Sequence, residues 1–282
     1  YIKEGTDDRL YAIAQLIRNG VDLTLIYTNT KIDLFFLEKF RNIVEFEKTV
    51  REHPLDEEVL RDAKRMGFSD KYIGQLWGLS EHEMYRLREK WNIFPVYKMI
   101  DTCASEFDSY VPYFYSTYEQ ENESVVSDRE KIVVLGSGPI RIGQGVEFDY
   151  STVHAIWSIR QAGYEAIIIN NNPETVSTDY TTSDKLYFEP LTVEDVMNVI
   201  RLEKPKGVVV SLGGQTAINL AEPLAELDVP IIGTDVVAIR NAEDRGCFER
   251  IMEELGIPQP QAEAVTTVED GVKAAARIGY PV

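Results

Sequence analysis

The chain has 282 residues, of which 44% are apolar and 27% charged, and its net charge is −18 at pH 7. This is the composition of an ordinary folded protein, and the length suggests two domains, or one domain and part of another. The acidic charge argues against nucleic acid as a partner, because a duplex binder needs a basic surface to displace counterions. We attribute the charge to solubility.

The sequence pattern also argues against a membrane protein, a disulfide-bonded protein and a zinc protein. No apolar run is long enough to span a bilayer and no basic leader precedes an apolar stretch, so no membrane location is expected and the cytoplasm is the expected compartment. Cys103 and Cys247 are far apart and belong to no CxxC or Cys/His cluster, which favours reduced core thiols. Three histidines argue against zinc. Because the chain lacks an initial methionine and stops at what looks like a strand entry, we expect a piece of a longer protein.

The first part of the chain, up to residue 122, has the pattern of an all-helical domain. Apolar residues recur at helical spacing with charged residues between them. Ser80 and Glu83 form the S-x-x-E pair of a capping box, which predicts the start of the last helix. The predicted helices are one capped by Thr6 or Asp7 and ended by Asn19-Gly20, one following Asn29, and three over 56–66, 69–79 and 80–91.

The short helices around Gly67 and Gly78 allow a second interpretation, a helix-turn-helix DNA-binding domain. The last helix carries Arg86, Arg88 and Lys90, but neighbouring glutamates offset these charges. The helix therefore lacks a basic surface, and DNA binding is not expected. Only an observation of salt-sensitive binding to duplex DNA would support this interpretation.

Residues 95–122 are rich in tyrosine and phenylalanine and include two prolines. This composition favours an extended, packed connection whose aromatic rings fill a core or an interface. The following stretch, 123–130, is polar and charged, and we place the domain boundary there.

From Lys131 onward, strand and helix patterns alternate. The unbroken apolar run 132–135 is typical of a central parallel strand. Repetition of strand and helix predicts a doubly wound parallel sheet of Rossmann type, with ligands at the carboxyl ends of its strands. Further strands are expected over 166–170, 185–188, 207–211 and 230–232, and helices over 149–162 (with Val153, Ile156, Trp157 and Ile159 buried), after Thr192, over 217–227 and after Thr234.

Three loops follow predicted strands, over 136–145, 170–178 and 211–216, and should converge at one edge of the sheet. The first is rich in glycine, so its amides could face an anion, although many doubly wound proteins have such a turn without a nucleotide. A dinucleotide site is disfavoured on two counts. The third glycine of the G-x-G-x-x-G fingerprint is replaced by Arg141, and the second strand runs into asparagines instead of an acidic residue.

Each candidate site residue has a functional and a structural interpretation. Arg141 could hold a phosphate or carboxylate, or pair with Glu147. Glu174 and Gln215 lie on the second and third loops, where polar residues often only cap turns and helices. Arg245 begins a predicted helix and could instead pair with the side chain four residues later.

Five segments, in order, closely resemble the start of the second synthetase half of the carbamoyl phosphate synthetase large chain. They are GSGPIRIGQGVEFDYS, NNNPETVSTDYTTSDKLYFEP, GGQTAINLA, IIGTD and AEDRGCFER. Upstream, TNTKIDLFFLE, PVYKMIDTCASEF and YFYSTYEQENES resemble the helical oligomerisation domain between the two halves. The resemblance covers essentially the whole chain. It implies an oligomerisation domain over 1–122, a pre-ATP-grasp α/β domain over 123–240 and the start of an ATP-grasp domain over 241–282.

The resemblance also implies functional roles. Arg245 would reach the bound ATP, while Gly145 and Glu174 would lie near the internal passage that brings carbamate to the second active site. The parent enzyme would be an ATP-dependent ligase that makes carbamoyl phosphate from bicarbonate, glutamine-derived ammonia and two ATP, for pyrimidine and arginine biosynthesis. It would use Mg²⁺ or Mn²⁺, with a glutaminase small subunit and other large subunits as partners.

In this family the ATP-grasp lysine, the mobile glycine-rich loop and the metal-binding carboxylates come after the GYPV that ends this sequence. We therefore expect no catalytic residue and no metal ligand here, no ATP turnover by this chain alone and no tight nucleotide binding. Two alternatives remain open. One is the pre-ATP-grasp part of a biotin-carboxylase-like enzyme, which would lack the helical region 1–122, and the other is an assembly module without chemistry.

Overall fold

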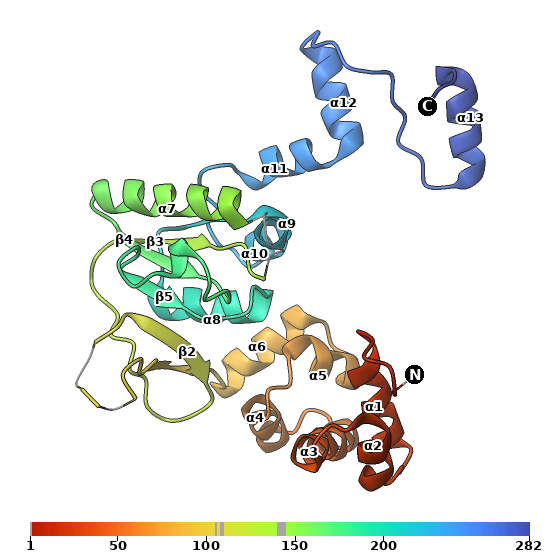
Figure 1. Ribbon diagram of the computed structural model, residues 1–282. Coiled ribbons are helices and arrows are strands. Elements are labelled where there is room, and N and C mark those ends of the chain that lie inside the picture. The colour runs from red at the N-terminus through yellow and green to blue at the C-terminus, as the bar shows by residue number, and fades with distance from the viewer. Residues whose placement is uncertain (1, 105, 108–109, 140–144) are drawn as a thin grey trace. The chain divides into compact units, whose positions relative to one another are not determined.

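The computed structural model describes residues 2–104, 106–107, 110–139 and 145–282. The chain forms two compact units, Tyr1–Lys98 with Ser116–Glu123, and Met99–Tyr115 with Ser124–Val282 (Figure 1). Within the described ranges, no helix is both long enough and apolar enough to cross a membrane.

The first unit is helical, as predicted. Its elements are α1 (Arg9–Arg18), α2 (Leu23–Thr30), α3 (Leu34–Glu52), α4 (Glu57–Arg65), α5 (Asp70–Trp77) and α6 (Glu81–Trp91), followed by the short strand β1 (Val96–Met99). The capping box of Ser80 and Glu83 is present at the start of α6.

The start of this unit differs from the prediction in two respects. The residue before α1 is Asp8, whose side chain makes no capping bond, so the predicted cap by Thr6 or Asp7 is wrong. Helix α2 was not predicted. It begins after Asp22, whose carboxylate accepts a hydrogen bond from the amide of Thr24, 2.7 Å away.

Two apolar clusters form the core of the first unit. Ile13 and Ile17 of α1 pack with Ile26 of α2 and Leu37 of α3. A larger cluster joins α3 to α6 and consists of Val50, Leu60, Ala63, Phe68, Ile73, Met84 and Ile93. The spacing of these residues predicted the helices, and their contacts set the packing.

A buried ion cluster reinforces the second core. Asp70 lies between two buried cations, with Lys64 Nζ 3.2 Å from one carboxylate oxygen and Arg88 Nη2 2.8 Å from the other. Arg88 is therefore a core residue and not part of a surface that could face DNA, which removes one of the three cations on which the helix-turn-helix interpretation depended.

The second unit contains a parallel sheet. Its strands are β2 (Tyr113–Thr117), β3 (Lys131–Leu135), β4 (Glu165–Ile169), β5 (Lys185–Tyr187) and β6 (Gly207–Val209), and the six-stranded sheet, with β1 at its edge, has the order β1-β2-β5-β4-β3-β6. The four neighbouring pairs among β2 to β6 are parallel. The prediction of a doubly wound parallel sheet is confirmed. Strand β2, from the tyrosine-rich segment, was not predicted.

Helices cover both faces of this sheet. Helix α7 (Gly145–Gln161) lies on one face and α8 (Val193–Glu203) on the other (Figure 1). The remaining helical segments are the 3₁₀ turn η1 (Val176–Thr178), α9 (Gly214–Ile218), α10 (Ala221–Glu226), α11 (Val236–Glu243), α12 (Arg245–Glu254) and α13 (Val268–Ile278). The single helix predicted over 217–227 is thus divided into α9 and α10.

One core prediction for α7 is wrong. Ile156 is fully buried against the sheet and Val153 is nearly so, but Trp157 is 53% exposed. Successive helical residues are rotated by about 100°, so the residue after a central core position points to the flank of the buried face. Trp157 instead contacts His154 on the exposed side of the helix.

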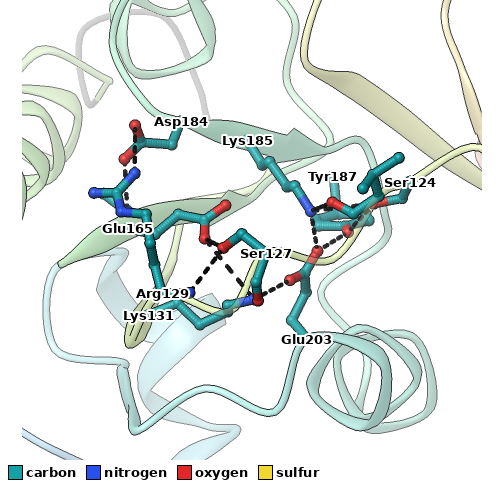
Figure 2. A network of polar contacts seen from close by, with 11 residues as sticks. Ser124, Ser127, Arg129, Lys131, Glu165, Asp184, Lys185, Tyr187 and Glu203 are labelled. Carbon is teal, nitrogen blue, oxygen red and sulfur yellow. Dashed lines mark hydrogen bonds and ion pairs between the residues drawn. The ribbon is translucent and has the colours of Figure 1, made fainter.

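Figure 2 shows a polar network at the amino-terminal edge of the sheet. Lys131, Glu165 and Lys185 are the first residues of β3, β4 and β5, and Glu203 is the last residue of α8. All four side chains are buried. The Glu203 carboxylate lies 3.2 Å from Lys131 Nζ and 2.7 Å from Lys185 Nζ, and it also accepts a hydrogen bond from Tyr187.

The same network holds the segment that leads into the sheet (Figure 2). Lys185 Nζ donates to the carbonyl of Val125 at 2.6 Å, and Lys131 Nζ donates to the carbonyl of Ser127 at 2.8 Å. Burial, followed by the charge of Glu203, raises the pKa of the Tyr187 hydroxyl above its ordinary value. Tyr187 therefore remains a neutral donor to the carboxylate.

Candidate functional site

The candidate site lies at the carboxyl-terminal edge of the sheet, opposite the ion network. Strand β3 is flanked by β4 on one side and β6 on the other, so the connections β3–β4 and β5–β6 run in opposite directions. In doubly wound sheets the crevice for ligands forms at such a reversal, outside the carboxyl ends of the strands. The loops after β3 and β6 border it.

These two loops approach each other through their backbones. A Cβ atom built on Gly213 would press against the carbonyl oxygen of Gly136 and lie 2.7 Å from the carbonyl carbon. A Cβ on Gly136 would in turn lie 2.5 Å from Cγ of Asn170. Glycine is therefore required at Gly213 by the close approach of the Gly136 backbone and at Gly136 by the buried side chain of Asn170.

Asn170 joins the loop after β3 to the loop after β4. Its side chain is buried at the end of β4, and its Oδ1 accepts hydrogen bonds from the amides of Gly138, at 2.9 Å, and Asn171, at 3.0 Å. The predicted convergence of the three loops is thus confirmed for their described residues. In the sequence, Asn170 had served only as an argument against a dinucleotide site.

Asp149, near the start of α7, holds the next part of the second loop. Its nearly buried carboxylate accepts hydrogen bonds from the amides of Val176, at 2.8 Å, and Ser177, at 3.0 Å. This arrangement caps the 3₁₀ turn with a charged acceptor. Asp149 was not a sequence candidate, because nothing local distinguishes it from a solvent-facing helical aspartate.

The predicted loop candidates occupy different positions. Arg141 falls outside the described residues. Gly145 is the first residue of α7. Glu174 is exposed, and its amide donates to Asn172 Oδ1 at 3.0 Å, which is a turn of the kind expected from its structural interpretation. Gln215, also exposed, donates from Nε2 to a carboxylate oxygen of Glu243 at 2.8 Å.

Arg245 is the first residue of α12, as predicted, and its side chain is exposed. No ion pair or hydrogen bond joins it to Glu249 or to any other side chain in the part of the chain that the structure describes. The intrahelical pair considered for it is therefore absent there. An uncommitted guanidinium on the first turn of a helix is available to a phosphate group.

Asp244 fixes the start of α12. Its carboxylate accepts a hydrogen bond from the amide of Cys247 at 2.8 Å, and this bond holds the pKa of the carboxyl below its usual range. Both cysteines are free thiols. Within the described ranges, no three His, Cys, Asp or Glu side chains gather as a metal-binding group.

Gly213→Ala should disrupt the candidate site. The new methyl group would force apart the loops after β3 and β6, because it would lie only 2.7 Å from the carbonyl carbon of Gly136 and closer still to its oxygen. We expect a loss of stability of about 2–3 kcal/mol, the scale of overpacking in a filled interior. Urea unfolding measures it. Gly246→Ala is the control, since its Cβ would meet only the Asp244 carboxylate, at 3.4 Å. Equal stability of the two variants would contradict the close approach.

The second unit is an α/β domain of the doubly wound class, with three loops that converge at its switch point. Residues 128–241 match the family model of the carbamoyl phosphate synthase pre-ATP-grasp domain. Residues 1–92 match the model of the carbamoyl-phosphate synthetase large chain, oligomerisation domain. The two matches lie in the expected order and together cover nearly three quarters of the chain. The chain belongs to the carbamoyl phosphate synthetase large-chain family.

Comparison with solved structures finds more distant likenesses. N5-carboxyaminoimidazole ribonucleotide synthetase from Thermus thermophilus is 19% identical with a TM-score of 0.38, over 53% of this chain and 37% of that one. Pyruvate carboxylase from Rhizobium etli is 13% identical with a TM-score of 0.40, over 54% and 14% of the two chains. The biotin carboxylase domain of a thermophilic 2-oxoglutarate carboxylase is 18% identical with a TM-score of 0.35, over 54% and 34%. With TM-scores below 0.5, these likenesses support no conclusion about function.

Proposed function

We propose that this chain acts within the large subunit of a glutamine-hydrolysing carbamoyl phosphate synthetase. Such an enzyme makes carbamoyl phosphate from bicarbonate, glutamine-derived ammonia and two ATP, for pyrimidine and arginine biosynthesis in the cytoplasm. The observation that carries the proposal is the succession of two large-chain domains, oligomerisation then pre-ATP-grasp, along one chain. A biotin-carboxylase-like enzyme would not account for the match over 1–92.

In this proposal the second unit belongs to the half that phosphorylates carbamate. A carbamate oxygen attacks the γ-phosphoryl group of ATP, and the protein contributes mainly orientation and neutralisation of charge. Arg245 would supply one positive charge to the nucleotide. Its exposed position on the first turn of α12, without a competing carboxylate among the described residues, supports this role.

Gly145 and Glu174 would border the passage for carbamate, with Arg141 and Gln215 as further loop residues. Glycine suits position 145 in this proposal, because a larger side chain there would obstruct a passage. The parent enzyme would require Mg²⁺ or Mn²⁺, which neutralises phosphate charge. We assign no metal ligand and no catalytic residue to the described residues, so we propose that this chain alone neither turns over ATP nor binds it tightly. Micromolar ATP affinity by calorimetry would contradict this.

The test of Arg245 uses the intact large chain and measures ATP formation from carbamoyl phosphate and ADP. This reverse reaction reports on the second synthetase half alone. Arg245→Ala should lower its rate by about 100-fold, the usual effect of removing one group that stabilises transferred charge. Arg250→Ala, on the same helix, is the matched control and should retain the rate. An unaffected Arg245→Ala enzyme would remove the residue from the nucleotide site, and absence of the reaction in a folded parent would overturn the proposed function.

We also propose that the helical unit mediates contacts between large chains. Helices α1 to α3 expose large apolar side chains that a monomer would leave in water, namely Leu10, Tyr11, Leu25, Tyr27, Leu34, Phe35 and Phe36. The family model matched by this unit is itself an oligomerisation domain. The glutaminase small subunit remains a proposed partner of the whole enzyme.

Self-association should be measurable on this chain by sedimentation. We expect an oligomer at high concentration, and we expect Phe35→Ser with Phe36→Ser to shift it towards monomer by removing exposed apolar area. Phe107→Ser is the matched control, since that ring is also exposed but belongs to the second unit. A wild-type chain that remains monomeric throughout would count against this role.

A further inference from the structure

Helix α11, which precedes the helix of Arg245, is only lightly packed. It has no buried residue. A groove of about 270 Å³ remains between α11 and the segment that contains α9 and α10. Its apolar lining is formed by Ile218, Ala221, Val236 and Ile239. Apolar contact across a partly open groove holds a helix loosely, because many of the dispersion contacts of a filled interior are missing.

Two polar contacts span this groove, and both involve the carboxyl-terminal half of α11. Gln215 Nε2 donates to Glu243 Oε2 at 2.8 Å, and Arg240 Nη2 lies 2.5 Å from Glu222 Oε1. The first contact connects the last residue of α11 to the first turn of α9, directly after the Gly213-Gly214 turn. It therefore links the loop after β6, which belongs to the candidate site, to the end of α11.

The end of α11 is coupled closely to Arg245. Asp244 alone separates α11 from α12, and it serves both helices. Its amide donates to the carbonyl of Arg240 at 2.9 Å, while its carboxylate accepts from the amide of Cys247 at 2.8 Å. A connection of one residue that is hydrogen-bonded to both helices has little conformational freedom. A displacement of Glu243 therefore moves the start of α12.

We propose that Gln215 is a positioning residue for Arg245, acting through Glu243 and the α11–α12 corner. Glutamine suits this position because its amide can donate to a carboxylate, whereas a glutamate there would repel Glu243. The placement of the nucleotide-facing arginine then depends on the loop after β6. This inference rests on the proposed nucleotide role of Arg245, but the contact itself can be tested without any nucleotide.

The first test measures amide hydrogen exchange of the peptide 244–251 in this chain. Gln215→Glu should accelerate exchange there by about fivefold, because the charge-assisted hydrogen bond is replaced by repulsion and the corner opens more often. Exchanging the two groups, with Gln215→Glu and Glu243→Gln together, should restore the slow rate. The amide then donates from position 243 to a carboxylate at 215.

Gln161→Glu is the matched control. It is the same substitution at an exposed helical position, where the described residues offer the side chain no hydrogen bond. It should leave exchange of 244–251 unchanged. Unchanged exchange in Gln215→Glu, or failure of the double substitution to restore it in a folded protein, would overturn the proposed contact.

The second test returns to the intact large chain and the reverse reaction with ADP. Gln215→Glu should raise KM for ADP several-fold with a smaller effect on kcat, and the double substitution should reverse the increase. A purely structural defect would not be rescued in this way. If exchange responds as expected but KM does not, the corner is held as proposed and Arg245 does not serve the nucleotide. If neither responds, the positioning role is wrong.

Discussion

Glu203→Ala should lower the free energy of unfolding of the second unit by about 3–5 kcal/mol, the cost of removing one partner from a buried ion pair. The reason is the position of Glu203 between Lys131 and Lys185, whose side chains are both buried at the amino edge of the sheet. Without the Glu203 carboxylate, Glu165 is the one negative charge of the network that remains near the two lysines. The hydroxyl of Tyr187 would also lose its hydrogen bond to this carboxylate.

The measurement is native-state hydrogen exchange of the β3 and β4 amides, which reports on this unit separately from the helical one. Glu226→Ala is the control, because Glu226 is also at the end of a helix but is not buried. We expect it to change stability by less than about 0.5 kcal/mol. Similar losses in the two variants would contradict a central role for Glu203.

A second variant separates two quantities: the net contribution of the buried ion cluster to stability, and the destabilisation caused by removing only one of its members. Replacing Lys131, Glu165, Lys185 and Glu203 together by methionine removes all four charges of the buried network. Such replacements are often neutral or stabilising, since desolvation offsets most of the attraction in a buried ion cluster. We therefore expect the quadruple variant to be more stable than Glu203→Ala, and the reverse order would contradict this explanation.

Asp70→Ala should have a comparable effect on the helical unit, a loss of about 3–5 kcal/mol. Asp70 is the shared carboxylate between Lys64 of α4 and Arg88 of α6, and all three side chains are buried. Its removal leaves two cations close together in the core, so repulsion adds to the loss of the ion pairs. The α4 and α6 helices should separate first.

Urea unfolding followed by tryptophan fluorescence measures this loss, because Trp77 and Trp91 pack against the core cluster of this unit. Asp62→Ala is the matched control. Asp62 pairs with Arg65 at 3.1 Å, but both side chains are about half exposed, and exposed pairs contribute about 1 kcal/mol or less. A loss no greater than that of the control would show that Asp70 is not the centre of the cluster.

Much of the architecture could be predicted from local pattern. Helical spacing of apolar residues identified most of the first unit, and the alternation of strands and helices predicted the parallel sheet. Short α2 was missed because its strongest signal is the single capping residue Asp22. Strand β2 was missed because a tyrosine-rich segment has no clear period, and its pairing with β5 depends on residues 73 positions away, as between Tyr113 and Leu186.

The candidate site was predictable to a smaller degree. Strand ends located the three loops, and the order of the elements predicted their convergence. Asn170 and Asp149 were not predicted in their clamping roles. Their hydrogen-bond partners, Gly138 and Val176, lie 32 and 27 residues away along the chain. Gln215 was a candidate, but its partner Glu243 became apparent only in the structure.

By itself, the sequence determined the helical first region, the parallel α/β second region, the glycine turns and the start of the helix at Arg245. These features depend on periodicity and on hydrogen bonds between residues a few positions apart, such as the capping box of Ser80 and Glu83. Only the tertiary structure decided which charges are buried together and which side chain of α7 faces water. Those outcomes depend on packing between segments that are far apart in the sequence. Burying a charged or polar group costs free energy unless a specific partner stabilises it, and no local pattern reveals that partner.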